Sequence, residues 1–299
     1  MFFKDAVKSL LRMHKEEVDV VFDLELFSRA SAILSFLSCA PIKVGFHRYR
    51  MEGLYRGNFF THKIQYNFQQ HLSKTLLSFA KVIHTERKDY PTMDEQIADE
   101  EIVAKSYESS EECIESIWKK LKKINPQVGR KNKLVILNPS AGLLPIRAWP
   151  VKNYIQLAQR ILEDSNNCII LTGGKNDRAI TGEVFSALES GRCIDLTCKT
   201  TFPELVDLYN VADVLVTNDS GPAHFASLTP IENFVFFGPE TPVLYRPLGE
   251  NTRILYSNFP CSPCITAFNH RYTTCLENKC LKVISVEEVY TLVREALVQ

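Results

Sequence analysis

The sequence has no excess of charge of either sign. Its 35 lysine and arginine residues balance 35 aspartate and glutamate residues, and the isoelectric point is near 7.0. Proteins that hold a nucleic-acid backbone use a positive surface field, which a neutral chain does not provide. The balance therefore argues against a nucleic-acid partner.

Long apolar runs and a secretory leader are also lacking. A membrane-spanning helix needs about 20 consecutive apolar residues, whereas the best candidate, residues 30–37, is short and lies between Arg29 and Lys43. Residues 1–5, Met-Phe-Phe-Lys-Asp, have neither the apolar core nor the small-residue cleavage site of a signal peptide. No internal repeat or low-complexity tract is present. These absences predict a cytoplasmic protein.

The chain is large enough for two domains. At about 150 residues per domain, 299 residues with 45% hydrophobic content can form two cores. The composition turns polar between Tyr90 and Lys133, which predicts a seam there. The basic runs of this seam are read as the solvated last turn of a helix over residues 110–124. We expect domains at residues 1–127 and 128–299, with a helix at the C-terminal end.

Apolar strands alternate with helical patterns along the second half, which predicts an α/β fold with a doubly wound parallel sheet. The expected strands are residues 134–137, 168–171, 193–196, 214–216 and 233–237, and the expected helices are residues 154–162, 177–188, 203–212 and 222–228. The first half shows the pattern more thinly, with a helix indicated by the spacing of Ala6, Leu10 and Leu11, strands at 18–23 and 42–46, helices at 28–38 and 71–83, and a long loop over 53–70.

One turn after a predicted strand is suited to holding a phosphate. Residues 217–224 read Thr-Asn-Asp-Ser-Gly-Pro-Ala-His. Asp219 or Ser220 suits a helix N-cap, Gly221 allows close approach of a ligand, and Pro222 suits the first helical turn. The N–H groups of such a turn can bind a phosphate.

Two neighbouring turns also carry groups that can bind a nucleotide. Both turns follow strands, and ligands of parallel sheets bind beyond the carboxyl ends of the strands. Ser140 and Gly142 are expected against phosphate. The segment Thr172-Gly173-Gly174 is expected beside a nucleotide, with Asp177 on its ribose. Ordinary turns use the same residue types, but several of them at one sheet edge favour a binding site.

Arg147 and His224 are further candidates. A cation at Arg147 would offset the charge of a diphosphate leaving group, and the alternative is a surface arginine stacked on Trp149. His224 is expected to be buried one turn into its helix, where a packing or hydrogen-bonding role is favoured over that of a base.

Nine cysteines are present, and four of them cluster. Cys261-x2-Cys264 and Cys275-x4-Cys280 are separated by ten residues, a spacing suited to a structural zinc ion in a reducing compartment. Unliganded thiols and labile disulfides stay open as alternatives, and no ferredoxin spacing is present. The other five are expected to be small buried hydrophobes, namely Cys39, Cys113, Cys168, Cys193 and Cys198.

Taken in order, these turns resemble glycosyltransferase family 9, the ADP-heptose:lipopolysaccharide heptosyltransferases. The resemblance covers the second half almost fully and extends thinly from about residue 18. It rests on residues 138–142, 147–150, 172–174, 217–224 and 237–239, with weaker matches at 20–24 and 44–46. The Asp-Ser-Gly-Pro-x-His turn is fairly specific, whereas the glycine pairs are not.

The resemblance implies a GT-B fold, with two Rossmann-like domains of which the second holds the nucleotide-sugar and the first the acceptor. Arg147 falls near the donor diphosphate, Asp177 near the ribose, and Asp219-Ser220-Gly221 where the phosphates and sugar are held. Transfer of heptose from an ADP-sugar to a lipopolysaccharide core or related glycan would be inverting and independent of metal. The base would be a first-domain carboxylate.

The first domain departs from the family pattern. The family's opening strand and its Gly-Asp loop, which carries the base, are not seen before the strand at 18–23, so we expect a shortened first domain. Glu25 is the candidate replacement base, and His47, Arg48 and Arg50 are candidate contacts to acceptor phosphates or carboxylates. A nucleotide-sugar-binding protein without catalysis and a nucleotide-sugar epimerase are the alternatives. Peripheral contact with the inner membrane face is also expected.

Overall fold

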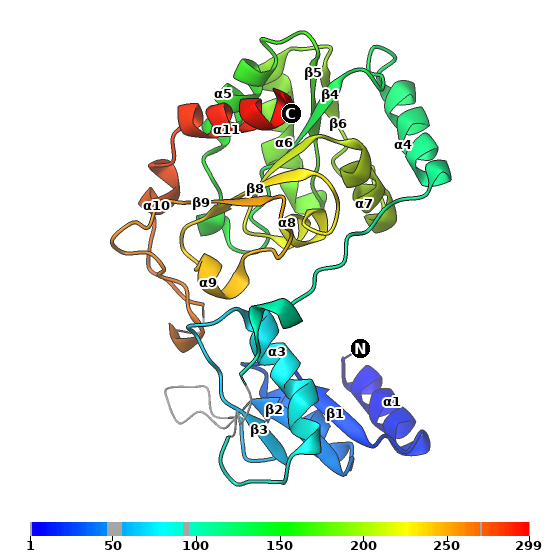
Figure 1. Ribbon diagram of the computed structural model, residues 1–299, viewed down its shortest axis with the longest axis vertical. Coiled ribbons are helices and arrows are strands. Elements are labelled where there is room, and N and C mark those ends of the chain that lie inside the picture. Colours follow the sequence, from blue (N-terminus) through cyan, green and yellow to red (C-terminus); the bar gives the residue numbers. More distant parts are fainter. Residues whose placement is uncertain (1, 47–55, 92–95, 270, 299) are drawn as a thin grey trace. The chain divides into compact units, whose positions relative to one another are not determined.

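The computed structural model describes residues 2–46, 56–91, 96–269 and 271–298 (Figure 1). The chain forms two compact units. Unit 1 comprises Met1–Val103 and Ile265–Thr273, and unit 2 comprises Ala104–Cys264 and Thr274–Gln299. The chain thus passes from one unit to the other three times. The helix over 111–124, which the predicted boundary at 127/128 assigns to the first half, belongs to unit 2.

Unit 2 is built on a six-stranded parallel sheet whose strand order is β6-β5-β4-β7-β8-β9. The strands are β4 (Lys133–Asn138), β5 (Asn167–Leu171), β6 (Cys193–Asp195), β7 (Val214–Asn218), β8 (Glu232–Phe237) and β9 (Thr252–Tyr256). The chain starts at β4, adds strands on one side, and returns to add β7 on the other. The order therefore reverses between β4 and β7, the place where sheets of this kind bind ligands.

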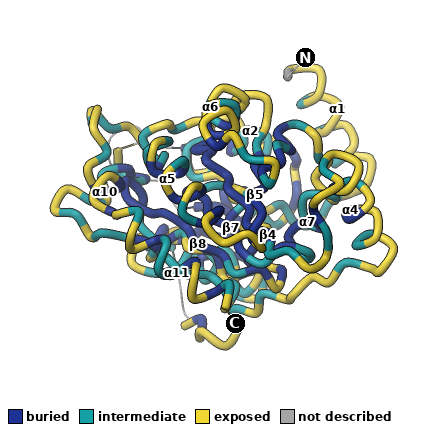
Figure 2. The backbone as a smooth tube through the Cα atoms, turned by 90° about the horizontal axis from the view of Figure 1, so that it is seen from above, coloured by how far each residue is buried: buried dark blue, intermediate teal, exposed yellow. Residues whose placement is uncertain are grey.

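Helices cover both faces of this sheet. They are α4 (Glu111–Ile124), α5 (Val151–Ile161), α6 (Arg178–Leu188), α7 (Phe202–Val211), α8 (Gly221–Ala226), α9 (Pro242–Tyr245), α10 (Lys279–Lys282) and α11 (Val286–Val298). Successive side chains of β4 alternate between two buried clusters. Val135 and Leu137 pack with α5, α6 and α11, whereas Leu134 and Ile136 pack with α4, α7 and α8. The central strands are accordingly buried, as Figure 2 shows.

The predicted α/β fold is confirmed, and the five strands expected in the second half are all present. The strand β9 was not predicted. Four of its five residues are only half-buried, because β9 lies at the edge of the sheet, and its sequence Thr-Arg-Ile-Leu-Tyr lacks the continuous apolar run of a central strand.

Unit 1 contains a three-stranded parallel sheet in the order β1-β2-β3. Its elements are α1 (Phe2–Lys15), β1 (Val20–Asp23), α2 (Arg29–Leu37), β2 (Ile42–Phe46), β3 (His62–Ile64) and α3 (Leu72–Lys81). The prediction of an unbroken loop over 53–70 is wrong, because β3 lies within it. Its His62 and Lys63 are atypical of strands and become buried by pairing with β2.

The core of unit 1 includes residues from the excursion Ile265–Thr273. Val44, Phe46 and Phe79 form its centre, and Ala267 is buried among them with Phe268 packed alongside. Phe268 also makes an edge contact with Tyr66, at 6.3 Å between ring centroids.

The expectation that the five scattered cysteines are buried is right only for Cys168 and Cys193. Cys113 and Cys198 are half-buried. Cys39 is exposed in the turn after α2, where its backbone is left-handed with φ at 57°. Across the described ranges, no helix has the length and apolar character needed to cross a membrane.

Candidate functional site

Two buried asparagines hold together the turns at the point where the strand order reverses. Asn218, the last residue of β7, donates from Nδ2 to the carbonyl oxygens of Pro139 and Ser140, each at 3.0 Å. Its Oδ1 accepts the backbone N–H of Trp149 at 2.8 Å. One fully buried side chain thus fixes both the turn after β4 and the approach to α5.

Asn138, the last residue of β4, connects its strand to the turn after the neighbouring strand β5. Its Nδ2 donates to the carbonyl oxygen of Thr172 at 3.2 Å and to the Thr172 hydroxyl at 3.1 Å. Thr172 is therefore committed to this internal contact and is buried. Neither asparagine was singled out in the sequence. Their position as polar residues ending apolar strands was the signal available.

Arg147 and Asp219 form an ion pair at this edge. Arg147 ends a short 3₁₀-helix (Pro145–Arg147), and its Nη1 lies 2.9 Å from Oδ2 of Asp219. The two side chains are 19% and 7% exposed. Nε of Arg147 is buried without a hydrogen-bond partner among the described residues, so the guanidinium keeps a donor beyond this pair. Arg147 is thus neither a surface residue nor stacked on Trp149 in any contact of the described residues, and Trp149 instead stacks on Phe236, 4.5 Å between ring centroids.

The turn after β7 differs in detail from the prediction. Ser220 occupies the N-cap position of α8, but its hydroxyl donates to the carbonyl oxygen of Asn218, at 3.1 Å, and does not cap the helix. Pro222 lies in the first turn, as predicted. A Cβ on Gly221 would meet Phe225 at an ordinary 3.5 Å, so the fold itself does not require glycine there.

The turn after β5 is shaped by Asp177. Its Oδ2 accepts the backbone N–H of Gly174 at 2.7 Å, and a Cβ on Gly173 would lie only 2.8 Å from the Asp177 Cβ. Gly173 is therefore required by the aspartate side chain of its own turn. The role of Asp177 on a ribose stays a prediction, with one carboxylate oxygen already engaged.

Ser140 and Gly142 lie beside this edge. The Ser140 hydroxyl accepts the N–H of Gly142 at 3.2 Å, and Gly142 adopts a φ of 58° in a turn with open space around it.

His224 is exposed, so the prediction that it is buried is wrong. The helix α8 buries Ala223 and Ala226 instead, and His224 falls on its other face.

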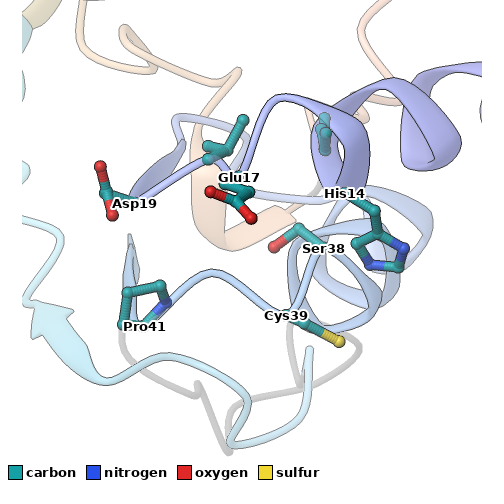
Figure 3. Close-up of a pocket in the computed structure, with 8 residues that line it drawn as sticks. His14, Glu17, Asp19, Ser38, Cys39 and Pro41 are labelled. Carbon is teal, nitrogen blue, oxygen red and sulfur yellow. The ribbon is translucent and has the colours of Figure 1, made fainter.

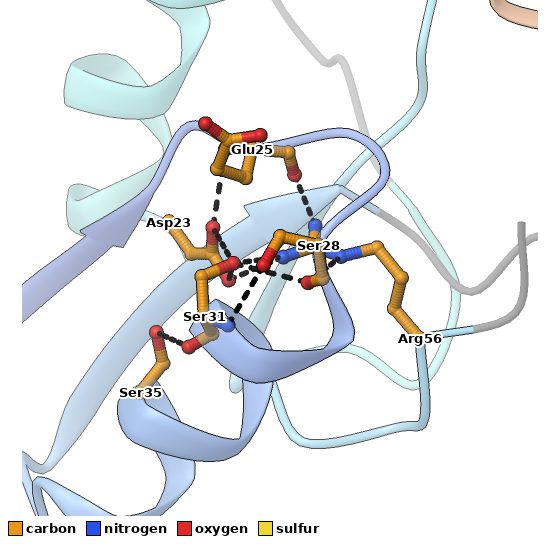
Figure 4. A network of polar contacts seen from close by, with 6 residues as sticks. All are labelled: Asp23, Glu25, Ser28, Ser31, Ser35 and Arg56. Atoms are coloured by element: carbon orange, nitrogen blue, oxygen red, sulfur yellow. Dashed lines mark hydrogen bonds and ion pairs between the residues drawn. The ribbon is translucent and has the colours of Figure 1, made fainter. Parts of the chain in front are cut away.

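Unit 1 holds a buried polar network at the end of β1 (Figure 4). Asp23 and Arg56 form an ion pair in which both side chains are almost fully buried, and the Ser31 hydroxyl donates to Asp23 at 3.0 Å. Arg56 also donates to the backbone carbonyls of Glu25 and Ser28. The network fixes the loop that follows β1.

Glu25 is exposed and enters this network through its backbone alone. Asp23 is engaged with Arg56 and Ser31, which makes it a structural residue. Glu25 is thus the carboxylate of this loop that remains accessible to a substrate. The candidate acceptor contacts His47, Arg48 and Arg50 lie outside the described residues.

A hollow of about 510 Å³ in unit 1 lies at the amino ends of β1 and β2 (Figure 3). It is lined by Met13, His14, Glu17, Val18, Asp19, Ser38, Cys39 and Pro41. Ligands of parallel sheets bind at the opposite ends of the strands, so this hollow is not the predicted site.

The four clustered cysteines all belong to unit 2, and none of them is in a disulfide. Burial raises the pKa of the Cys280 thiol to about 11, and the nearby thiols of Cys264, Cys261 and Cys275 add to this shift. Within the described ranges, no three His, Cys, Asp or Glu side chains are arranged to hold a metal ion. The structural zinc therefore stays a prediction.

Comparison with known proteins points to one family. The model of glycosyltransferase family 9 (heptosyltransferase) matches residues 8–272. Lipooligosaccharide heptosyltransferase 2 of Campylobacter jejuni is 27% identical over 176 residues, which cover 57% of this chain and 53% of that protein. The chain thus spans about half the length of the curated relatives that it matches.

Solved structures show the same fold. The ADP-heptose lipopolysaccharide heptosyltransferase II of E. coli matches with a TM-score of 0.72 at 19% identity, covering all of this chain and 82% of that one. A family 9 glycosyltransferase from Veillonella parvula matches with a TM-score of 0.71 at 18% identity, covering 98% of this chain and 79% of that one. The predicted GT-B class is confirmed. With the family model matching most of its length, the chain belongs to glycosyltransferase family 9, the heptosyltransferases.

Proposed function

We propose that the protein transfers heptose from an ADP-sugar donor to a lipopolysaccharide core or related glycan, with inversion and without a metal ion. The observation that carries this proposal is the Arg147–Asp219 pair at the reversal point of the sheet of a family 9 chain. A fixed cation at this edge supplies the charge that a departing diphosphate needs.

The reaction is a displacement at the anomeric carbon of the donor sugar. The acceptor hydroxyl oxygen attacks that carbon, the bond to the ADP oxygen breaks, and the electron pair leaves on the β-phosphate. Arg147 stabilises this growing charge, and Asp219 orients the guanidinium. Ser220 and Gly221 hold the sugar-phosphate end.

The proton of the acceptor hydroxyl goes to a carboxylate, for which we propose Glu25. It is exposed, and its loop is held by the buried Arg56. Because Arg56 binds the backbone of this loop and not the Glu25 carboxylate, the base is positioned without being neutralised.

The names of the relatives support the proposed donor and acceptor. The matched proteins are named lipooligosaccharide or lipopolysaccharide heptosyltransferases, and one solved relative is described as an ADP-heptose enzyme. We propose the same donor and acceptor classes here, with His47, Arg48 and Arg50 as contacts to acceptor phosphates.

We also propose a cytoplasmic location with peripheral contact to the inner membrane face. On α1, Phe3, Val7 and Leu11 are 79%, 40% and 65% exposed and share one face of the helix. Lys4 and Lys8 flank this face, as expected of a helix that lies on an anionic bilayer.

The test is transfer of labelled heptose from ADP-heptose to a deacylated core glycan in the presence of EDTA. Wild type should form product, and Arg147→Ala should lower kcat by about 100-fold. Arg130→Ala is the matched control, because Arg130 pairs with Glu115 on the surface of the same unit, and its kcat should be unchanged.

The other outcomes identify the alternatives. Donor binding without turnover would make the protein a nucleotide-sugar-binding protein. Release of an isomerised sugar without acceptor would make it an epimerase. Loss of activity in EDTA that Mg²⁺ restores in the absence of added zinc would contradict metal independence, whereas restoration by Zn²⁺ alone would be attributed to the cysteine site.

A further inference from the structure

A residue of the cysteine-rich loop holds the backbone on both sides of Arg147. Asn278, between Cys275 and Cys280, donates from Nδ2 to the carbonyl oxygen of Ile146 at 3.0 Å and to that of Ala148 at 2.7 Å. These are the two residues that flank Arg147 in the chain. A side-chain amide carries two N–H donors, so both bonds form at once.

The backbone of Asn278 is itself fixed. Asn278 precedes α10, and its carbonyl accepts the N–H groups of Leu281 and Lys282. In α10, Cys280 is buried and packs against Gly238. A Cβ added to Gly238 would lie only 2.8 Å from the sulfur of Cys280. Ser257 donates to the Cys280 carbonyl at 2.7 Å. The amide is therefore presented from a rigid segment.

The chain just after the 3₁₀-helix that carries Arg147 has a second attachment, at Trp149. Trp149 is held through its backbone N–H by Asn218 and through Nε1 by the carbonyl of Ile284, at 3.0 Å. Loss of the Asn278 contacts would leave this attachment in place. The fold would persist, while the backbone of residues 146–148 would gain conformational freedom.

We propose that Asn278 is a positioning residue for Arg147. It fixes the two peptide units on either side of the arginine, so that the guanidinium meets the donor diphosphate without first being ordered. This inference deepens the proposed function and rests on it, because the role of Arg147 on the diphosphate belongs to that proposal.

The test is a double-mutant cycle that combines Asn278→Asp with Arg147→Ala and reads ADP affinity by calorimetry. Aspartate has nearly the same shape, but it has no donors and places a carboxylate against two carbonyl oxygens. In the wild-type background, Asn278→Asp should weaken ADP binding about tenfold, the loss expected for a hydrogen-bonded contact. In the Arg147→Ala background the change should be less than about twofold.

Two further variants separate positioning from stability. Asn278→Ser removes the amide without adding charge, and it should weaken ADP binding in the same direction. Asn251→Asp is the matched control, because Asn251 donates to the carbonyl of Pro230 elsewhere in unit 2, and ADP binding should not change. For the Asn278 variants, kcat should fall more than KM rises.

An equal loss of ADP affinity in both backgrounds would overturn the inference, since Asn278 would then act independently of Arg147. Wild type that binds ADP but forms no product would contradict the proposed transfer reaction alone, because the cycle on ADP affinity still decides the role of Asn278. Wild type that binds no ADP would contradict both.

Discussion

Asp219 is the counter-charge of an arginine that is four-fifths buried, and this makes the pair costly to break. The guanidinium has little access to water, so removing its carboxylate leaves a buried positive charge without compensation. Exposed ion pairs differ in this respect, because water replaces the lost partner.

Asp219→Ala should therefore lower the free energy of unfolding by about 2 kcal/mol. Denaturant melts of wild type and variant measure this change. The control is Glu115→Ala, which breaks the exposed pair with Arg130. It should lower the free energy of unfolding by less than about 1 kcal/mol. Equal losses in the two variants would show that the burial of Arg147 contributes nothing.

The site could be predicted from sequence in its location and less well in its contacts. Turn chemistry after the apolar strands indicates which edge of the sheet carries Arg147 and Asp219. The roles of Asn138, Asn218 and Asn278 could not be predicted, because each amide binds backbone groups that are distant in the chain. His224 was misplaced because the burial of a residue on a helix as short as α8 depends on which face meets the sheet.

At the scale of elements, most strands and helices follow from apolar periodicity. The strands β3 and β9 escaped prediction, since β3 contains polar residues buried by pairing and β9 lies at an edge. The helix α1 was expected from the spacing of Ala6, Leu10 and Leu11, whereas the exposure of one apolar face is a result of the tertiary structure.

That face of α1 leads to a prediction about membranes. Leu11→Asp should weaken sedimentation with anionic phosphatidylglycerol vesicles by about tenfold, because an apolar contact is replaced by a negative charge. The binding should also fall as salt is raised. Phe185→Asp, at an exposed apolar position of α6, is the control. Unchanged binding of the Leu11 variant would contradict the contact.

We propose a structural zinc ion at Cys261, Cys264, Cys275 and Cys280 as a staple of the segment that presents Asn278. Protein purified under reducing conditions should contain about one zinc ion per chain, and Cys264→Ser should lose it and melt several degrees lower. Cys39→Ser, an exposed cysteine of unit 1, should change neither quantity. Absence of zinc from the wild-type protein, together with an unchanged melting temperature of Cys264→Ser, would contradict the proposed zinc site.

At the scale of the whole molecule, the two units are not two halves of the sequence. Composition predicts a polar seam between two domains, and it cannot show that Ile265–Thr273 returns to the first core. Nothing in the local sequence of this segment distinguishes it from an ordinary loop. Its assignment depends on the packing of Ala267 and Phe268 in the core of unit 1, where Phe268 contacts the rings of Tyr66 and Phe68.

Phe268→Ala should therefore destabilise unit 1 and spare unit 2. Hydrogen exchange followed by mass spectrometry should show faster exchange in β2, β3 and α3, with a cost of more than about 1 kcal/mol. Phe259→Ala is the matched control, since Phe259 packs on the core of unit 2. Faster exchange confined to the neighbourhood of residue 268 would contradict the assignment.

The return of Ile265–Thr273 to unit 1 also bears on how new enzymes can be made from this family. A chimera that joins the first part of one member to the second part of another at a single crossover brings in a foreign 265–273 segment. That segment would meet a core with which it did not evolve, at Phe46, Tyr66 and Phe79. Exchange of unit 1 between members therefore calls for three junctions, near residues 103, 264 and 273, so that the segment is transferred together with its own core.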